Sequence, residues 1–98
     1  MLTIWKYKLS TEGGVKTILL PKGAKIITVQ AQEGEPYISA LVNPGEPDRP
    51  RFIEIFGTGY SIEDIPDTRL DYIGTFQFTS RTFTFHVFER VNLNTDIS

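Results

Sequence analysis

The chain has 98 residues, a net charge of −2 and no cysteine. A chain of this length forms one domain that hides only about two-thirds of its extended surface, so the core is thin. The missing cysteines exclude disulfides, thiolate metal sites and a cysteine nucleophile. Lysines and arginines are scattered, which leaves no basic footprint for duplex nucleic acid. No apolar run approaches the roughly 20 residues of a membrane helix, and the start of the chain lacks a signal-peptide core.

Alternation of apolar and polar residues recurs along the chain and predicts about seven short strands and no persuasive helix. The expected strands are residues 2–9, 15–20, 25–32, 37–42, 51–56, 70–78 and 82–89. Short polar turns predict two hairpins, which join residues 25–32 to 37–42 and residues 70–78 to 82–89. We therefore expect one all-β domain over residues 1–91, a small antiparallel β-sandwich or open barrel, followed by a polar tail over 92–98.

The pattern within strands also predicts which side chains share a face. Ile27, Val29 and Ala31 are expected on one face of their strand, Tyr72, Phe76 and Phe78 on one face across Gly74, and Phe83, Phe85 and Val87 on one face of its partner. The segment 43–50 contains three prolines and is expected to be irregular. The strand 37–42 is apolar at nearly every position, so we expect a homodimer or larger assembly to cover it.

The alternation breaks most sharply at residues 57–60, where Gly57, Thr58 and Gly59 precede Tyr60. Two glycines flanking a threonine can turn backbone N–H groups outward as a small nest for an anion. The competing interpretation is a glycine-rich exit from a strand. The segment is not a phosphate loop, because the Lys-Ser/Thr of that motif is missing and no helix is expected there.

His86 is the only histidine, and it lies on the strand face opposite Phe83, Phe85 and Val87. A lone histidine in a strand is more often a hydrogen-bonded structural residue than a ligand or a base. With no cysteine beside it, a transition-metal site is improbable. No serine has the context of a nucleophile elbow, so we expect a protein without catalytic activity, metal or cofactor.

Two further residues have both a structural and a functional interpretation. Trp5 shares its predicted strand face with Tyr7 and Leu9, which is typical of a core, but such a face can also stack a base. Arg51, which with Arg49 brackets a proline, could grip a phosphate or carboxylate with two hydrogen bonds or could solubilise a loop edge.

Several ordered blocks resemble a family of small uncharacterised proteins of tailed phages and prophages. The resemblance covers roughly residues 2 to 89 and rests on Ile4–Tyr7, Leu20–Ile26, Val29–Gln32, Ala40–Pro44, Phe56–Gly59, Tyr72–Gln77 and Phe85–Glu89. Similar sequences tend to have a histidine after the Gly-Thr-Gly, where this chain has Tyr60, so a role that needs an imidazole there is not expected.

The resemblance implies a phage-encoded protein that acts in the cytoplasm of the bacterial host. Small non-enzymatic phage proteins often counter host defence, and one class sequesters nucleotide second messengers. Our hypothesis is that this chain binds such a small anionic signal without cleaving it. The expected ligand-binding residues are Gly57, Thr58 and Gly59 for phosphate, Tyr60 or Trp5 for a base, Arg51 or Lys22 for charge, and His86 for the ligand or the turn. The alternative is a structural or protein-binding accessory, such as a virion component or an inhibitor of a host protein.

Overall fold

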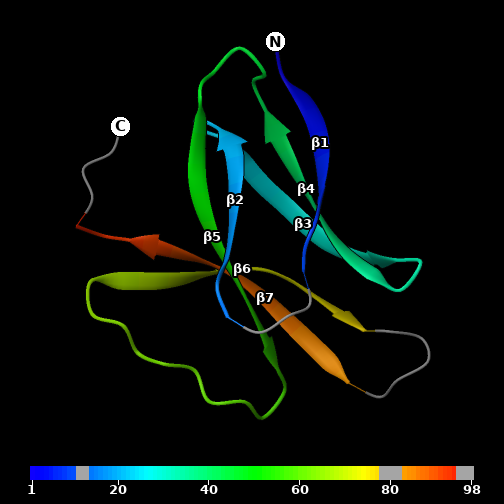
Figure 1. Ribbon diagram of the computed structural model, residues 1–98, viewed down its shortest axis with the longest axis vertical. Coiled ribbons are helices and arrows are strands. Elements are labelled where there is room, and N and C mark those ends of the chain that lie inside the picture. The colour runs from blue at the N-terminus through cyan, green and yellow to red at the C-terminus, as the bar shows by residue number, and fades with distance from the viewer. Residues whose placement is uncertain (11–13, 78–82, 95–98) are drawn as a thin grey trace.

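The computed structural model describes residues 1–10, 14–77 and 83–94, and this part of the chain is all-β (Figure 1). Its strands are β1 (Thr3–Lys8), β2 (Lys16–Pro21), β3 (Lys25–Gln32), β4 (Glu35–Val42), β5 (Asp48–Gly57), β6 (Thr68–Gln77) and β7 (Thr84–Asn92). None of the described residues belongs to a helix that is long and apolar enough to cross a membrane. The prediction of an all-β chain with seven strands is confirmed.

The strands form two sheets in which all neighbours are antiparallel. The three-stranded sheet has the order β1-β4-β3, and the four-stranded sheet has the order β2-β5-β7-β6. Both predicted hairpins are confirmed as antiparallel pairs, β3 with β4 and β6 with β7. The turn expected at residues 79–81 lies outside the described residues. Because β7 is antiparallel to both β5 and β6, the strands β5 and β6 run in the same direction, and their connection must travel the length of the sheet.

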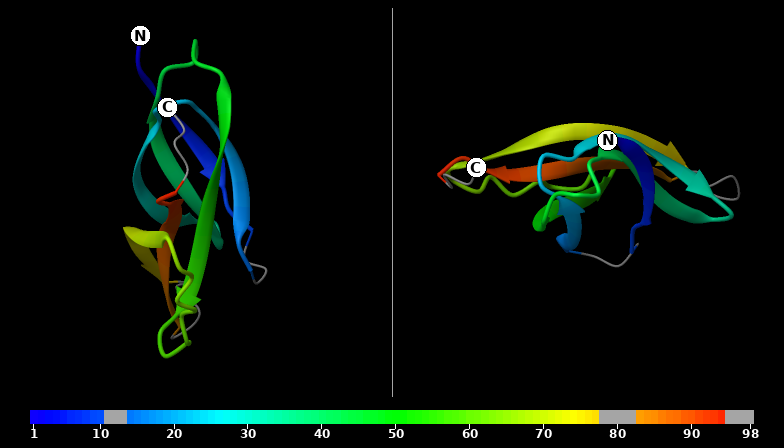
Figure 2. Two further views of the ribbon diagram at one scale, coloured as in Figure 1. Left: turned by 90° about the vertical axis from the view of Figure 1, so that its left-hand side faces the viewer. Right: turned by 90° about the horizontal axis from the view of Figure 1, so that it is seen from above.

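The two sheets are closest where β3 lies beside β6. At the other side, β1 and β2 are the end strands of their sheets, and in the described chain they do not pair with each other (Figure 2). The molecule therefore has the form expected of a small sandwich or open barrel.

The core lies between the inner faces of the two sheets. Its larger cluster consists of Leu9, Val29, Ile38, Ile53, Phe76 and Val87, and a smaller one of Leu20, Ala24, Ala40 and Val42. Tyr7 packs against both clusters, and its buried hydroxyl has no hydrogen-bond partner in the part of the chain that the structure describes. Burial, and to a lesser extent the charge of Asp48, raises the pKa of this phenol.

A β-bulge in β3 places Ile27 on a different face from Val29, with which it was expected to share one. The pairing with β4 passes from Ile26, opposite Ala40, directly to Thr28, opposite Ser39. One extra residue reverses the alternation along the strand. As a result Ile26 packs against the core while Ile27 is 46% exposed. Val29 lies in the core, whereas Ala31, near the end of the strand, is exposed.

A second bulge, in β6, separates two aromatic residues that were expected to share a face. The pairing with β7 passes from Tyr72, opposite Phe88, to Gly74, opposite Val87, and leaves Ile73 as the extra residue. Tyr72 therefore lies on the outer face and is exposed, whereas Phe76 is buried in the core. The third member of the expected set, Phe78, lies outside the described residues.

The irregular region is shorter than the predicted segment 43–50, because β5 already begins at Asp48 and includes Pro50. Pro50 lies opposite Leu19 of β2. On the other side of β5, the pairing with β7 reaches only as far as Phe52. A proline without an N–H is tolerated at such a position because no ladder hydrogen bond is lost there.

β4 is the central strand of its sheet, with β1 on one side and β3 on the other. Its apolar side chains alternate between a buried set and a half-buried set. β4 therefore has no unpaired edge. The assembly was expected because such an edge would have needed a cover. The homodimer or larger assembly stays a prediction.

Gly74 allows the close approach of β6 to β3, and its replacement is expected to destabilise the fold. A Cβ atom at this position would lie 2.8 Å from Cγ1 and 3.4 Å from the backbone N of Val29. We expect Gly74→Ala to lower the free energy of unfolding by about 1–3 kcal/mol through overpacking. Urea denaturation followed by circular dichroism measures this loss. Gly45→Ala is the matched control, because a Cβ there meets only Asn43 Oδ1 at 3.4 Å; an equal loss in both variants would contradict the prediction.

Candidate functional site

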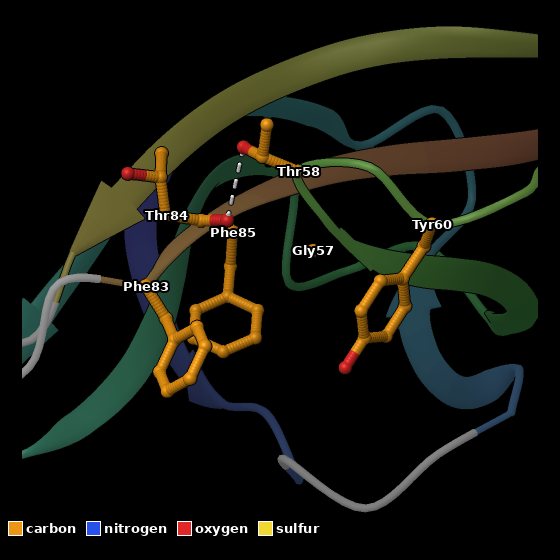
Figure 3. A pocket seen from close by; sticks show the side chains of 6 residues that line it. All are labelled: Gly57, Thr58, Tyr60, Phe83, Thr84 and Phe85. Carbon is orange, nitrogen blue, oxygen red and sulfur yellow. Dashed lines mark hydrogen bonds between the residues drawn. The ribbon is translucent and has the colours of Figure 1, made fainter.

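A pocket of about 300 Å³ opens where β5 ends beside the start of β7 (Figure 3). It is lined by Gly57, Thr58, Tyr60, Phe83, Thr84 and Phe85. Three of the residues expected to bind a ligand, Gly57, Thr58 and Tyr60, are therefore brought together here. The lining contains three aromatic rings and no charged side chain.

The turn at the end of β5 holds Tyr60 at the pocket. Gly57 pairs with Phe85 at the end of the strand, and the chain then reverses through Gly59, whose φ of 91° is in the left-handed region that favours glycine. The Tyr60 N–H donates to Gly57 O at 3.1 Å, and the Thr58 N–H donates to Thr84 O at 3.2 Å. These two N–H groups are thus used inside the protein and do not face outward for an anion.

The rings stand on the two sides of Gly57. A Cβ at Gly57 would lie 3.2–3.4 Å from three atoms of the Tyr60 ring, so this ring rests against the strand only because residue 57 has no side chain. On the other side, Phe85 stacks on Phe76 with a centroid distance of 5.4 Å, and Phe83 lies 6.5 Å from Phe85. In Figure 3 the rings of Tyr60, Phe83 and Phe85 extend from the same side of the backbone. The arrangement can receive a flat, uncharged ring.

His86 holds the turn from the opposite face of the sheet. Its Nε2 lies 2.8 Å from Thr58 Oγ1, and its Nδ1 lies 3.2 Å from Thr75 Oγ1, which in turn lies 2.6 Å from Tyr72 Oη. The Thr58 hydroxyl also donates to Thr84 O at 3.4 Å. Each ring nitrogen of His86 therefore has a threonine hydroxyl within hydrogen-bond distance. Of the two roles expected for His86, this geometry supports orientation of the turn.

Arg51, Lys22 and Trp5 do not line the pocket. The Arg51 guanidinium forms a two-bond ion pair with Glu89, in which Nη2 donates to Oε1 at 2.9 Å, and its Nη1 donates to Ala24 O at 2.8 Å. Lys22 lies in the turn between β2 and β3. Trp5 lies on β1 in the other sheet. The charge and the second stacking ring that these residues were expected to supply are therefore not at this pocket.

A buried ion pair on the outer face of the four-stranded sheet was not foreseen. Arg90 Nε donates to Glu54 Oε2 at 2.5 Å, and Arg90 Nη2 donates to Glu54 Oε1 at 3.1 Å. The same guanidinium donates to Thr68 Oγ1 and Glu63 O, which ties the connection between β5 and β6 to β7. The hydrogen bond to Glu54 is the main cause that raises the pKa of Arg90. Each of the three guanidinium nitrogens of Arg90 donates to a group of the protein, so the pair is structural.

The pocket residues that the sequence did not single out are Phe83, Thr84 and Phe85. Their side-chain alternation was apparent, but their position depends on the register in which Gly57 pairs with Phe85. Among the described residues, no group of three or more His, Asp or Glu side chains is placed to hold a metal ion. The site is therefore an aromatic pocket without a metal cluster in the described chain.

Comparison with known proteins identifies a family without assigning a role. No curated protein and no solved structure matches the chain. The sequence model of a domain of unknown function, DUF7352, matches residues 1–97, and the chain therefore belongs to that family.

Proposed function

We propose that this protein binds a small nucleotide-derived signal by its base and withholds it from a host defence effector without cleaving it. The observation that carries the proposal is the pocket itself, in which Tyr60, Phe83 and Phe85 surround an uncharged space beside Gly57. Aromatic rings bind bases by stacking, which contributes about 1–3 kcal/mol per base. The base, rather than the phosphate, is the part of the ligand that these residues suit.

The size of the pocket limits what it holds. Its volume of about 300 Å³ is at the lower end of the range for ligand pockets, so it accommodates one base and leaves the remainder of a dinucleotide outside. Nanomolar retention requires about −12 kcal/mol, which stacking of one base does not supply. The remaining contacts, including those to phosphate, must come from outside the pocket. A second subunit is the source that we propose, in keeping with the expected homo-oligomer.

The phage origin and the action in the host cytoplasm rest on the resemblance of the sequence blocks to tailed-phage and prophage proteins. The absence of cleavage is supported by the position of His86. Both of its ring nitrogens contact threonine hydroxyls on the face opposite the rings, so it does not reach a ligand in the pocket as a general base.

The test is native mass spectrometry and calorimetry with a panel of cyclic dinucleotides and ADP-ribose isomers. We expect one ligand to bind and to be recovered intact after the protein is heat-denatured. Thr58→Ala and His86→Ala, which release the turn, are expected to weaken that binding. Recovery of a cleaved ligand would show an enzyme. Binding of no ligand, or binding that ignores both substitutions, would favour the structural or protein-binding accessory.

Removal of the Tyr60 ring tests the pocket directly. We expect Tyr60→Ala to raise the Kd of the bound ligand by about 5- to 150-fold, the loss that corresponds to one stacking contact. Calorimetry measures the change. Trp5→Ala is the control, because it removes the other aromatic side chain that the sequence suggested for stacking but lies in the other sheet. A larger loss in Trp5→Ala than in Tyr60→Ala would place the base elsewhere.

A further inference from the structure

β1 presents an unpaired edge to solvent. It is an end strand of the three-stranded sheet, where it pairs with β4 on one side and with no strand of the described chain on the other. The alternate N–H and C=O groups of such an edge form hydrogen bonds with an added strand. An extended polypeptide is therefore the kind of ligand that this edge recognises.

The inner face of β1 is incompletely covered. Trp5 lies opposite Ala40 and Tyr7 lies opposite Ile38, and both of these β4 residues are fully buried. Trp5 is nevertheless 41% exposed, because nothing in the described structure covers it at the free edge. An added strand would cover Trp5 with apolar side chains on the same face.

The outer face of β1 is basic. It carries Lys6 and Lys8 beside the exposed Ile4, and β1 has no acidic residue, although the whole chain has a net charge of −2. Lys6 Nζ donates to Gln32 Oε1 at 2.7 Å and lies 4.8 Å from the centroid of the Tyr37 ring, so it meets no carboxylate in the described chain. Lys8 lies 3.6 Å from Glu35, but both side chains are exposed, and such a pair contributes little.

We infer that the free edge of β1 binds an extended segment of a partner protein in which apolar and acidic residues alternate. Backbone hydrogen bonds to β1 supply the affinity. The apolar residues cover Trp5 on the inner face, and the acidic residues lie beside Lys6 and Lys8 on the outer face. A second copy of β1 fits less well, since it would bring lysines opposite lysines on the same face. This inference is independent of the pocket.

Trp5 provides the measurement, because it is the only tryptophan. The probe is an eight-residue capped peptide of alternating glutamate and valine, titrated to millimolar concentration. We expect a saturable blue shift of the tryptophan emission as the indole leaves water. The same peptide with all its backbone N–H groups methylated, and a peptide of alternating lysine and valine, are expected to give no shift.

Charge reversal separates strand pairing from non-specific contact. In the double variant Lys6→Glu/Lys8→Glu we expect the glutamate peptide to bind about fivefold more weakly or worse, and the lysine peptide to bind instead. Lys22→Glu/Lys25→Glu makes the same change of charge in the β2–β3 turn and on β3, and it should leave the preference unchanged. Absence of the shift, or equal binding of the glutamate and lysine peptides, would overturn the inference. A shift that depends on protein concentration alone, with a doubled mass in light scattering, would overturn it in favour of pairing between two copies.

Discussion

Replacing Arg90 with methionine is expected to lower the free energy of unfolding by about 3–5 kcal/mol. The side chains of Arg90 and Glu54 are each only 11% exposed, and the guanidinium contacts the carboxylate through two of its nitrogens. Removing one partner leaves the other charge buried without compensation, and desolvation of a lone charge is costly. The loss of the bonds to Thr68 and Glu63 would also release the connection between β5 and β6. Urea denaturation measures the change.

The matched control is Arg69→Met, which removes an arginine from an exposed pair. Arg69 Nε lies 2.7 Å from Asp71 Oδ1, but the two side chains are 56% and 44% exposed, so solvent already screens the attraction. We expect the free energy of unfolding of Arg69→Met to stay close to that of the unmodified protein. The double variant Glu54→Leu/Arg90→Met should recover much of the stability of the single variant, because no charge is left buried. Similar losses for Arg90→Met and Arg69→Met would show that burial of the first pair has no energetic effect.

Ile38→Ala is expected to lower the free energy of unfolding by about 2–5 kcal/mol. Ile38 is fully buried in the larger core cluster, in the middle of β4, between Tyr7 of β1 and Val29 of β3. Because strands enclose it on both sides, the cavity left by the substitution cannot collapse easily. Thermal and urea unfolding give two independent measurements of the loss.

Ile27→Ala deletes the same atoms in the neighbouring strand β3 and serves as the control. Ile27 is the extra residue of the bulge and is 46% exposed. We expect a loss within about 0.5–1 kcal/mol, as is usual for a surface position. A loss as large as that of Ile38→Ala would mean that Ile27 faces the core, as the alternation alone suggests.

Strands and hairpins were predictable because their signals are local. The limits of β3 coincide with the predicted residues 25–32, and the short polar turn Glu33–Gly34 joins β3 to β4. The face of the sheet on which each side chain lies was predictable only as far as the first bulge of a strand. Nothing in the alternation around Ile27 or Ile73 shows which residue has no partner, because that depends on how the neighbouring strand pairs.

The candidate site was predictable in part for the same reason. The glycines of residues 57–60 predicted the turn. Thr58 and His86, which were both selected from the sequence as candidate site residues, are in contact. Phe83 and Phe85 were not associated with that turn, because the pairing of β5 with β7 joins segments distant in the sequence. Arg51 was interpreted as a free cation for the same reason. Its partner, Glu89, lies on β7 and could not be assigned without the register.

The strand order of the two sheets also determines when each strand can pair with its neighbour during synthesis. β1 and β2 leave the ribosome first, but β1 pairs with β4 and β2 pairs with β5, which are made later. The β3–β4 and β6–β7 hairpins need only neighbouring residues and form in about 1–10 μs once their strands are present. At about 5–20 residues per second, the first two strands remain without partners for seconds. The nascent chain thus exposes β1 and β2 longest, and β2 contains the apolar run Ile18–Pro21.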